Sequence, residues 1–168
     1  IPIARYANLI EFALLEHYGG TWIDSTVYLT DPIPDMILNS DFFAVRNSLL
    51  LIDNPVLYPA WFLHAKRGNK TIREIRNVAF AYWLKNEHVI EYLLPNLIIT
   101  LVVKSNPEFE QEIPYMNSDY SEYLVKALAD EYSEEKWNWI KKLTGIHELT
   151  YKLDAAVNRK DSFYQHII

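Results

Sequence analysis

The chain has 168 residues and a net charge of −6 at neutral pH, and half of its residues are hydrophobic. This length and apolar content favour one folded domain, residues 1–168, over a disordered chain or two domains. The acidic balance disfavours a chain-wide basic surface for nucleic acid, and the lack of cysteine excludes disulfides, thiolate zinc sites and thiol nucleophiles. The longest apolar run, residues 93–103, is too short to cross a bilayer, which needs about 20 residues.

The first half of the chain is predicted to combine one helix with several strands. Residues 6–18 carry apolar side chains at helical spacing, and Gly19 follows where a helix C-cap requires positive φ. Residues 22–29 are rich in aromatic and β-branched side chains, which predicts one continuous strand. Further short strands are expected at residues 42–45, 49–52 and 61–65.

The second half is predicted to be mostly helical. Helices are expected at residues 71–84, 89–103, 121–132 and 134–143. Asn69 and Ser133 are the expected N-caps of the first and last of these helices, and Gly145 ends the last one. Pro95 is expected to kink or to start the second helix. Residues 146–168 show little periodicity and form a mixed tail.

One segment, residues 18–26, has the features of a ligand site. A helix stops at Gly19 and Gly20, and the strand that follows delivers Asp24, which we expect at the end of a central strand. Glycine allows a ligand to approach the main chain closely, and a carboxylate can hold a hard divalent cation that also takes phosphate oxygens. The same pattern fits a glycine turn whose aspartate caps a neighbouring loop, so the residues alone leave both interpretations open.

Residues 7–27 resemble the signature of the capsular-polysaccharide-synthesis glycosyltransferases, which are relatives of the DXD-motif sugar transferases of the initiating mannosyltransferase type. In that signature a helix leads through Gly-Gly to the pattern W-x-D-x-T, represented here by Trp22, Asp24 and Thr26. The resemblance implies an α/β fold that is GT-A-like, with a mixed sheet flanked by helices and a largely helical C-terminal half. It continues in order at residues 41–43, 61–69, 82–83 and 146–152.

The resemblance also implies a reaction. A sugar would pass from a nucleotide-sugar donor to a glycan acceptor in bacterial surface polysaccharide synthesis, with Mn²⁺ or Mg²⁺ as cofactor. By matching positions, Asp24 would bind the metal or the donor, and His147 would be a second metal ligand. Gly19, Gly20 and Thr26 would contact the donor.

Three further residues receive roles from the same resemblance. Asn8 would contact the donor, Lys152 would neutralise a phosphate, and Glu91 would face the acceptor as the catalytic carboxylate. Asn8 and Glu11 depart from the Asp and Arg that are usual in the family, which places turnover in question more than the fold.

In this family a nucleotide-binding βαβ region precedes the signature, and we expect that region to be missing from this chain. The chain would then be the C-terminal part of a longer cytoplasmic enzyme, held at the inner face of the membrane through its parent protein, and a poor catalyst alone. No nucleic acid is expected as a partner, and the oligomeric state is not predicted. Two alternatives stay open: a non-catalytic glycan- or partner-binding module with the same fold, and a helical interaction domain whose aromatic residues all serve the core.

Overall fold

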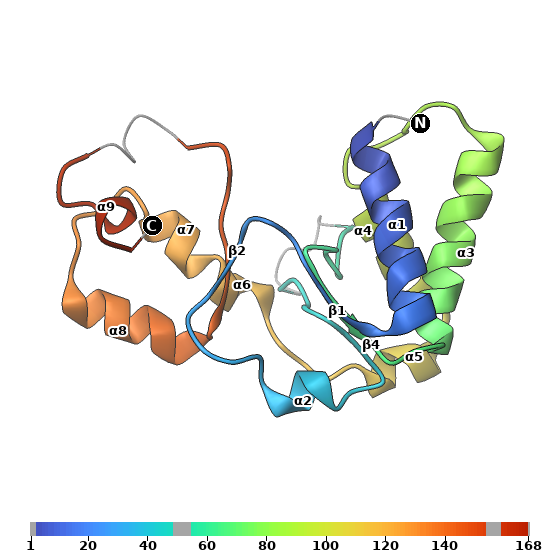
Figure 1. Ribbon diagram of the computed structural model, residues 1–168, viewed down its shortest axis with the longest axis horizontal. Coiled ribbons are helices and arrows are strands. Elements are labelled where there is room, and N and C mark those ends of the chain that lie inside the picture. Colours follow the sequence, from blue (N-terminus) through green and yellow to red (C-terminus); the bar gives the residue numbers. More distant parts are fainter. Residues whose placement is uncertain (1–2, 49–54, 154–158, 168) are drawn as a thin grey trace. The chain divides into compact units, whose positions relative to one another are not determined.

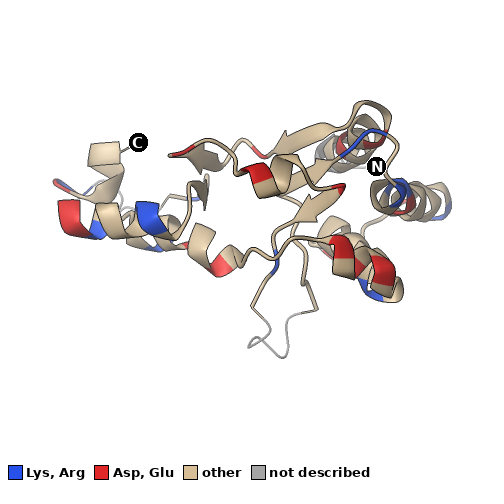
Figure 2. Cartoon of the chain, turned by 90° about the horizontal axis from the view of Figure 1, so that it is seen from below, with Lys and Arg blue, Asp and Glu red and all other residues tan. Residues whose placement is uncertain are grey.

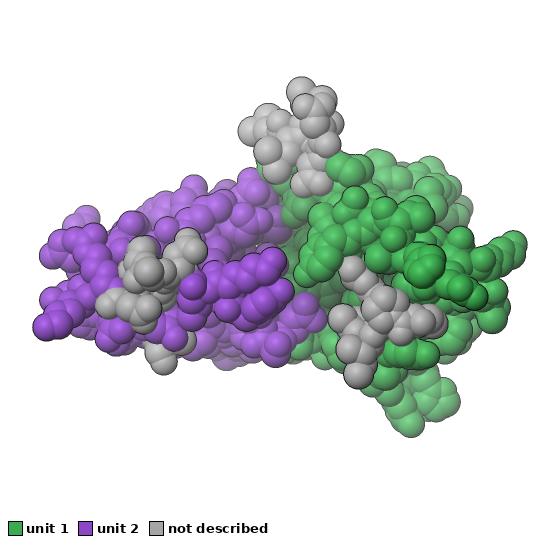
Figure 3. All heavy atoms as spheres, turned by 90° about the horizontal axis from the view of Figure 1, so that it is seen from above, with its two compact units in different colours: residues 1–23, 34–116 green, residues 24–33, 117–168 purple. Residues whose placement is uncertain are grey.

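The folded chain divides into two units, which Figure 3 colours separately. Unit 1 comprises residues 1–23 and 34–116, and unit 2 comprises residues 24–33 and 117–168. The structure, a computed structural model, describes residues 3–48, 55–153 and 159–167. Both units combine helices with short antiparallel strands, which confirms the predicted mixed α/β class.

Unit 1 packs three long helices beside a small antiparallel sheet (Figure 1). Its elements are α1 (Ile3–Tyr18), β1 (Gly20–Ile23), α2 (Asp35–Leu38), β3 (Phe42–Ala44), β4 (Phe62–Ala65), α3 (Lys70–Lys85), α4 (Leu94–Ser105) and α5 (Pro107–Glu112). The strand order is β1-β4-β3, with Thr21 opposite His64 and His64 opposite Phe43. Helix α1 packs against α3, and α3 packs against α4, so that their apolar faces share one core with the sheet.

Unit 2 is built on one pair of strands and several short helices. Its elements are β2 (Val27–Leu29), α6 (Ser118–Ser121), α7 (Tyr123–Ala127), α8 (Glu134–Leu143), β5 (Ile146–Glu148) and α9 (Phe163–Ile167). Strands β2 and β5 are antiparallel, with Tyr28 opposite His147. The core of this unit is formed by Leu124, Ala127, Leu128, Ile140 and Phe163.

Local signals in the sequence fix several of the helix ends. Helix α1 ends where predicted, because Gly19 has a φ of +73° and its N–H donates to the Leu15 carbonyl. Asn69 caps α3 by accepting from the Ile72 N–H at 3.1 Å, and Ser133 caps α8 through the Lys136 N–H. The predicted helices at residues 6–18, 71–84 and 134–143 are therefore confirmed.

Helix α4 begins later than predicted. It starts at Leu94, not at residue 89, and Pro95 lies in its first turn. Proline is tolerated there because it lacks an N–H and presets a helical φ. Pro95 therefore starts this helix and does not kink it.

The prediction of one continuous strand at residues 22–29 is wrong, because this segment contains two strands, β1 and β2. A turn follows Ile23, and the Val27 N–H donates to the Asp24 carbonyl at 3.0 Å. Strand β1 pairs with β4 in unit 1, whereas β2 pairs with β5 in unit 2. Strand β1 is also an edge strand and β4 is the central one, so the expected central strand before Asp24 is corrected.

The predicted helix at residues 121–132 is shorter than expected. Helix α7 ends at Ala127, because the chain beyond it bonds elsewhere in unit 2. The Tyr164 N–H donates to Leu128, and the Tyr132 N–H donates to Asp161. These tertiary hydrogen bonds replace the helical ones. The predicted strands at residues 42–45 and 61–65 are confirmed, whereas the one at residues 49–52 lies outside the described residues.

Replacing Gly19 by alanine is expected to destabilise unit 1 more than replacing Gly20. Both glycines have positive φ, +73° and +106°, which costs an alanine roughly 1–2 kcal/mol. A Cβ on Gly19 would also lie 2.6 Å from the Arg67 backbone nitrogen, whereas a Cβ on Gly20 would meet no described atom within 4 Å. Urea denaturation should show a loss of about 3 kcal/mol or more for Gly19→Ala and a smaller loss for Gly20→Ala. Equal losses would contradict this close approach.

Candidate functional site

The two glycines of the signature have different surroundings. The bare side of Gly19 is covered by the Arg67 backbone, and the Gly68 N–H donates to the Glu16 carbonyl at 2.8 Å beside it. Gly19 therefore allows the end of α1 to pack against the loop that precedes α3. Gly20 has open space on its bare side, so it is the glycine whose main chain a ligand can approach.

Asp24 lies directly after β1, in the turn that leads into β2. Its carbonyl accepts from Val27, and the Thr26 carbonyl accepts from the Leu149 N–H at 2.9 Å, next to β5. Asp24 and Thr26 are both half-buried. The prediction that a strand delivers this carboxylate at its end is confirmed, and the turn places it in unit 2.

In unit 2, burial and the negative charges of two carboxylates raise the pKa of a third. Burial, together with the negative charges of Glu122 and Asp24, raises the pKa of Glu148 to about 7. Charges that repel each other noticeably lie within about one Debye length, because water and salt screen more distant ones. Glu148 was not predicted as a site residue. Its only sequence signal is an acidic residue within the late block at residues 146–152.

His147 is fully buried in the core of unit 2. Its Nε2 lies 3.0 Å from the Thr30 hydroxyl, and its Nδ1 has no hydrogen-bond partner among the described residues. Burial lowers the pKa of His147 to about 4, partly offset by the charge of Asp31, so the imidazole is neutral near pH 7. Side chains alternate along a strand, so His147 and Glu148 project to opposite faces of β5.

A hollow of about 330 Å³ opens beside the signature turn in unit 2. Its lining includes tyrosines, residues with hydroxyl groups and leucines. Ser25, the residue directly after Asp24, is one of the lining residues. The lining residues are Ser25, Thr26, Val27, Tyr28, Leu128, Leu149, Thr150, Tyr151, Leu153 and Tyr164. Lys152 does not line it. It is exposed, with its Nζ 5.6 Å from the centroid of the Tyr151 ring.

Asn8 and Glu91 belong to unit 1. Asn8 is half-buried on α1, and its Nδ2 donates to the Glu11 carboxylate at 3.2 Å. The two departures from the family pattern therefore contact each other across one turn of the helix. Glu91 is exposed in the turn before α4, where its carboxylate accepts from the Leu93 N–H at 3.4 Å.

The structure thus brings Asp24 and Thr26 together with the strand that carries His147 and Glu148. Asn8, Gly19, Gly20 and Glu91 lie in the other unit. Among the described residues, no group of three or more His, Asp or Glu side chains is placed to hold a metal ion. None of the described helices has the length and apolar character that a membrane crossing requires.

A family model of capsular polysaccharide synthesis proteins matches residues 1–167. The chain belongs to this family. The match covers the signature turn and the late strand that carries His147 and Glu148, so the resemblance seen in the sequence is confirmed at the level of the family. No curated protein matches the chain.

The raised pKa of Glu148 predicts a pH-dependent stability. Its folded-state pKa of about 7 lies above the ordinary value of 4.5, so between these values the folded chain keeps a proton that the unfolded chain has released. Stability is therefore lost as the pH rises through this window, and Glu148→Gln removes that loss because glutamine does not titrate. In urea denaturation, the free energy of unfolding of Glu148→Gln relative to the wild type should be higher at pH 8 than at pH 4, by on the order of 1–3 kcal/mol.

A matched control is Glu135→Gln, an exposed position on α8, which should have the same small effect at both pH values. In a chain that keeps Glu148, Glu122→Gln should move the pH range over which stability is lost to lower values, because it removes a negative charge that raises the pKa of Glu148. An effect of Glu148→Gln that does not change with pH would contradict the grouping of these carboxylates.

Proposed function

We propose that this chain forms the diphosphate-binding part of a GT-A-like glycosyltransferase, which moves a sugar from a nucleotide-sugar donor to a glycan acceptor during capsule synthesis. The observation that carries the proposal is Asp24, placed at the end of β1 and close enough to Glu148 to raise its pKa. Membership of the capsular polysaccharide synthesis family supports the biological role.

The residues of unit 2 fit a divalent cation that is shared with the substrate. Glu148 and its neighbour Asp24 repel each other, and a bound cation would offset this repulsion. Mg²⁺ is commonly held by one or two carboxylates together with substrate phosphates, without a complete protein cage. The described residues include no such cage.

In the proposal, Asp24 and Glu148 hold Mn²⁺ or Mg²⁺, which when bound supplies positive charge to a diphosphate leaving group. His147, the second metal ligand that the family resemblance implied, projects to the other face of β5 and is left out of this cation site. Its neutral, buried imidazole lies 3.0 Å from the Thr30 hydroxyl and supports the strand that carries Glu148.

The remaining residues would position the donor and the acceptor. Thr26 lines the hollow beside Asp24 and would contact the donor, and the exposed ammonium of Lys152 would neutralise a phosphate. The open main chain of Gly20 and the amide of Asn8 are the proposed donor contacts in unit 1. Glu91, an exposed carboxylate, is the proposed acceptor-facing catalytic residue.

The contact between Asn8 and Glu11 fits the fold of α1. An amide and a carboxylate make a hydrogen bond between these positions, one turn of the helix apart. The two departures from the family pattern therefore do not disrupt the helix, and the nucleotide-sugar titration below distinguishes an enzyme from a non-catalytic module.

Nucleotide-sugar binding by this chain is expected to be weak and to require metal. The protein supplies few ligands to the cation, so Mn²⁺ alone should bind weakly and should bind better with a diphosphate present. Asp24→Asn should abolish the metal-dependent binding, because it removes the carboxylate at the end of β1. The measurement is calorimetric titration with UDP-glucose and GDP-mannose, with and without Mn²⁺.

Asp35→Asn, at an exposed acid in α2, is the control and should bind as the wild type does. Lowering the pH from 8 to 6 should weaken the binding, since Glu148 must release its proton to hold a cation. Tight binding without metal that survives Asp24→Asn would refute the proposal. Binding of glycans but of no nucleotide-sugar would favour the non-catalytic module.

A further inference from the structure

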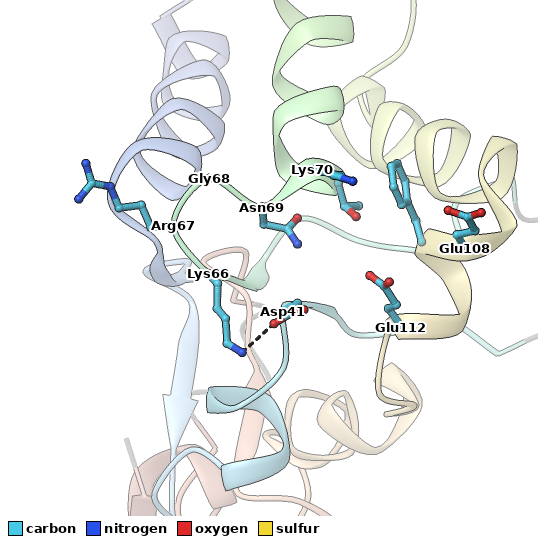
Figure 4. Close-up of a pocket in the computed structure, with 10 residues that line it drawn as sticks. Asp41, Lys66, Arg67, Gly68, Asn69, Lys70, Glu108 and Glu112 are labelled. Carbon is cyan, nitrogen blue, oxygen red and sulfur yellow. Dashed lines mark ion pairs between the residues drawn. The ribbon is translucent and has the colours of Figure 1, made fainter.

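A second pocket lies entirely within unit 1. It has a volume of about 390 Å³ and opens between the loop that precedes α3 and the short helix α5 (Figure 4). Its lining is almost entirely polar and charged, with one aromatic ring. The lining residues are Asp41, Lys66, Arg67, Gly68, Asn69, Lys70, Thr71, Glu108, Phe109 and Glu112.

One side of this pocket, formed by Asn69 and Lys70, presents hydrogen-bond donors. The Oδ1 of Asn69 is committed to the Ile72 N–H, and its Nδ2 has no hydrogen bond to the described residues. The Lys70 ammonium likewise makes no ion pair with them. The first turn of α3 adds N–H groups that no carbonyl of the helix can accept. We call this the donor side.

The opposite side, formed by Glu108 and Glu112 of α5, presents acceptors. Both carboxylates are exposed, and neither has an ion pair or hydrogen bond with the described residues. Figure 2 shows the acidic residues along this helix. Between the two glutamates in sequence lies Phe109, whose ring is partly exposed in the pocket wall. We call this the acceptor side.

The other charged residues of the pocket leave little free charge inside it, because Lys66 and Asp41 are paired and the Arg67 side chain points away from the pocket (Figure 4). Lys66 and Asp41 form an ion pair at 2.7 Å (Figure 4), so this pair has little attraction left for a charged ligand. An anion that reaches Lys70 would be repelled by Glu108 and Glu112, and a cation that reaches these glutamates would be repelled by Lys70. A ligand that satisfies both sides therefore carries no net charge, and it must both donate and accept hydrogen bonds.

We propose that this pocket binds a neutral sugar unit of a glycan. A sugar hydroxyl donates to a carboxylate and accepts from an amide or ammonium, as the acceptor and donor sides require. The C–H face of a sugar ring is apolar and can cover the exposed part of the Phe109 ring. The inference goes beyond the proposed function, because it needs neither Asp24 nor a metal.

The test is saturation-transfer NMR and calorimetric titration of the full chain with neutral trisaccharides of glucose, galactose and mannose at millimolar concentrations. At least one should bind without metal or nucleotide, and its affinity should not change with ionic strength, since the ligand carries no charge. Asn69→Asp keeps an oxygen to cap α3 but removes the Nδ2 donor, so it should weaken binding about tenfold without unfolding the chain.

Glu112→Gln removes a charged acceptor and should weaken binding by a similar factor, about tenfold. Glu74→Gln, at an exposed position on α3 outside the pocket, is the matched control and should leave binding unchanged. Asp24→Asn should also leave it unchanged, so that a failure of the nucleotide titration and a failure of this test are distinguishable. Absence of binding by all three sugars, binding by Asn69→Asp and Glu112→Gln that is as tight as binding by the wild type, or competition by inorganic phosphate would each overturn the proposal.

Discussion

The close approach of two backbone segments at Gly19 determines the arrangement of unit 1. Because Gly19 has no side chain, the end of α1 lies against the Arg67 backbone, and β1 starts at once in register with β4. Glu16, one turn earlier, accepts from Gly68 through its carbonyl and forms ion pairs with Arg73 and Arg76. These contacts join α1, the loop before α3 and the first turns of α3. The signature glycine thus also holds the loop that forms the donor side of the sugar pocket.

The second constraint is electrostatic and concerns unit 2. The chain places Asp24 in a turn, and the pairing of β2 with β5 brings Glu148 within range of its charge. Burial of Glu148 makes this proximity unfavourable in the absence of a counter-charge. A site under such repulsion is well suited to a cation that arrives with its substrate, because the ion relieves the repulsion only when it is bound.

The sequence allowed the helices with strong local signals to be predicted. Caps at Asn69 and Ser133 and the positive φ of Gly19 depend on neighbouring residues alone. The break after Ile23 depends on which strand each half pairs with, and apolar content does not reveal this. The early end of α7 likewise depends on hydrogen bonds from residues that are distant in sequence, such as Tyr164.

The residues of the candidate site also differ in whether local sequence signals or tertiary contacts determine their role. Asp24 was predictable because a helix, two glycines and a strand lead to it in unbroken order. Glu148 was not, because its role depends on Glu122 and Asp24, which only the fold brings near. The sugar pocket also escaped prediction, since its two sides come from α3 and α5, and no short motif contains both.

Asn69 links the stability of the fold to the recognition of a ligand through two atoms of one side chain. Its oxygen is used by the helix, and its nitrogen is left for the pocket. Aspartate, serine and threonine would all cap α3, yet each would present a different group to the ligand. A single substitution at this position would therefore change the group that faces the pocket, with little loss of helix stability. The cap position is in this sense a point at which specificity can evolve separately from folding.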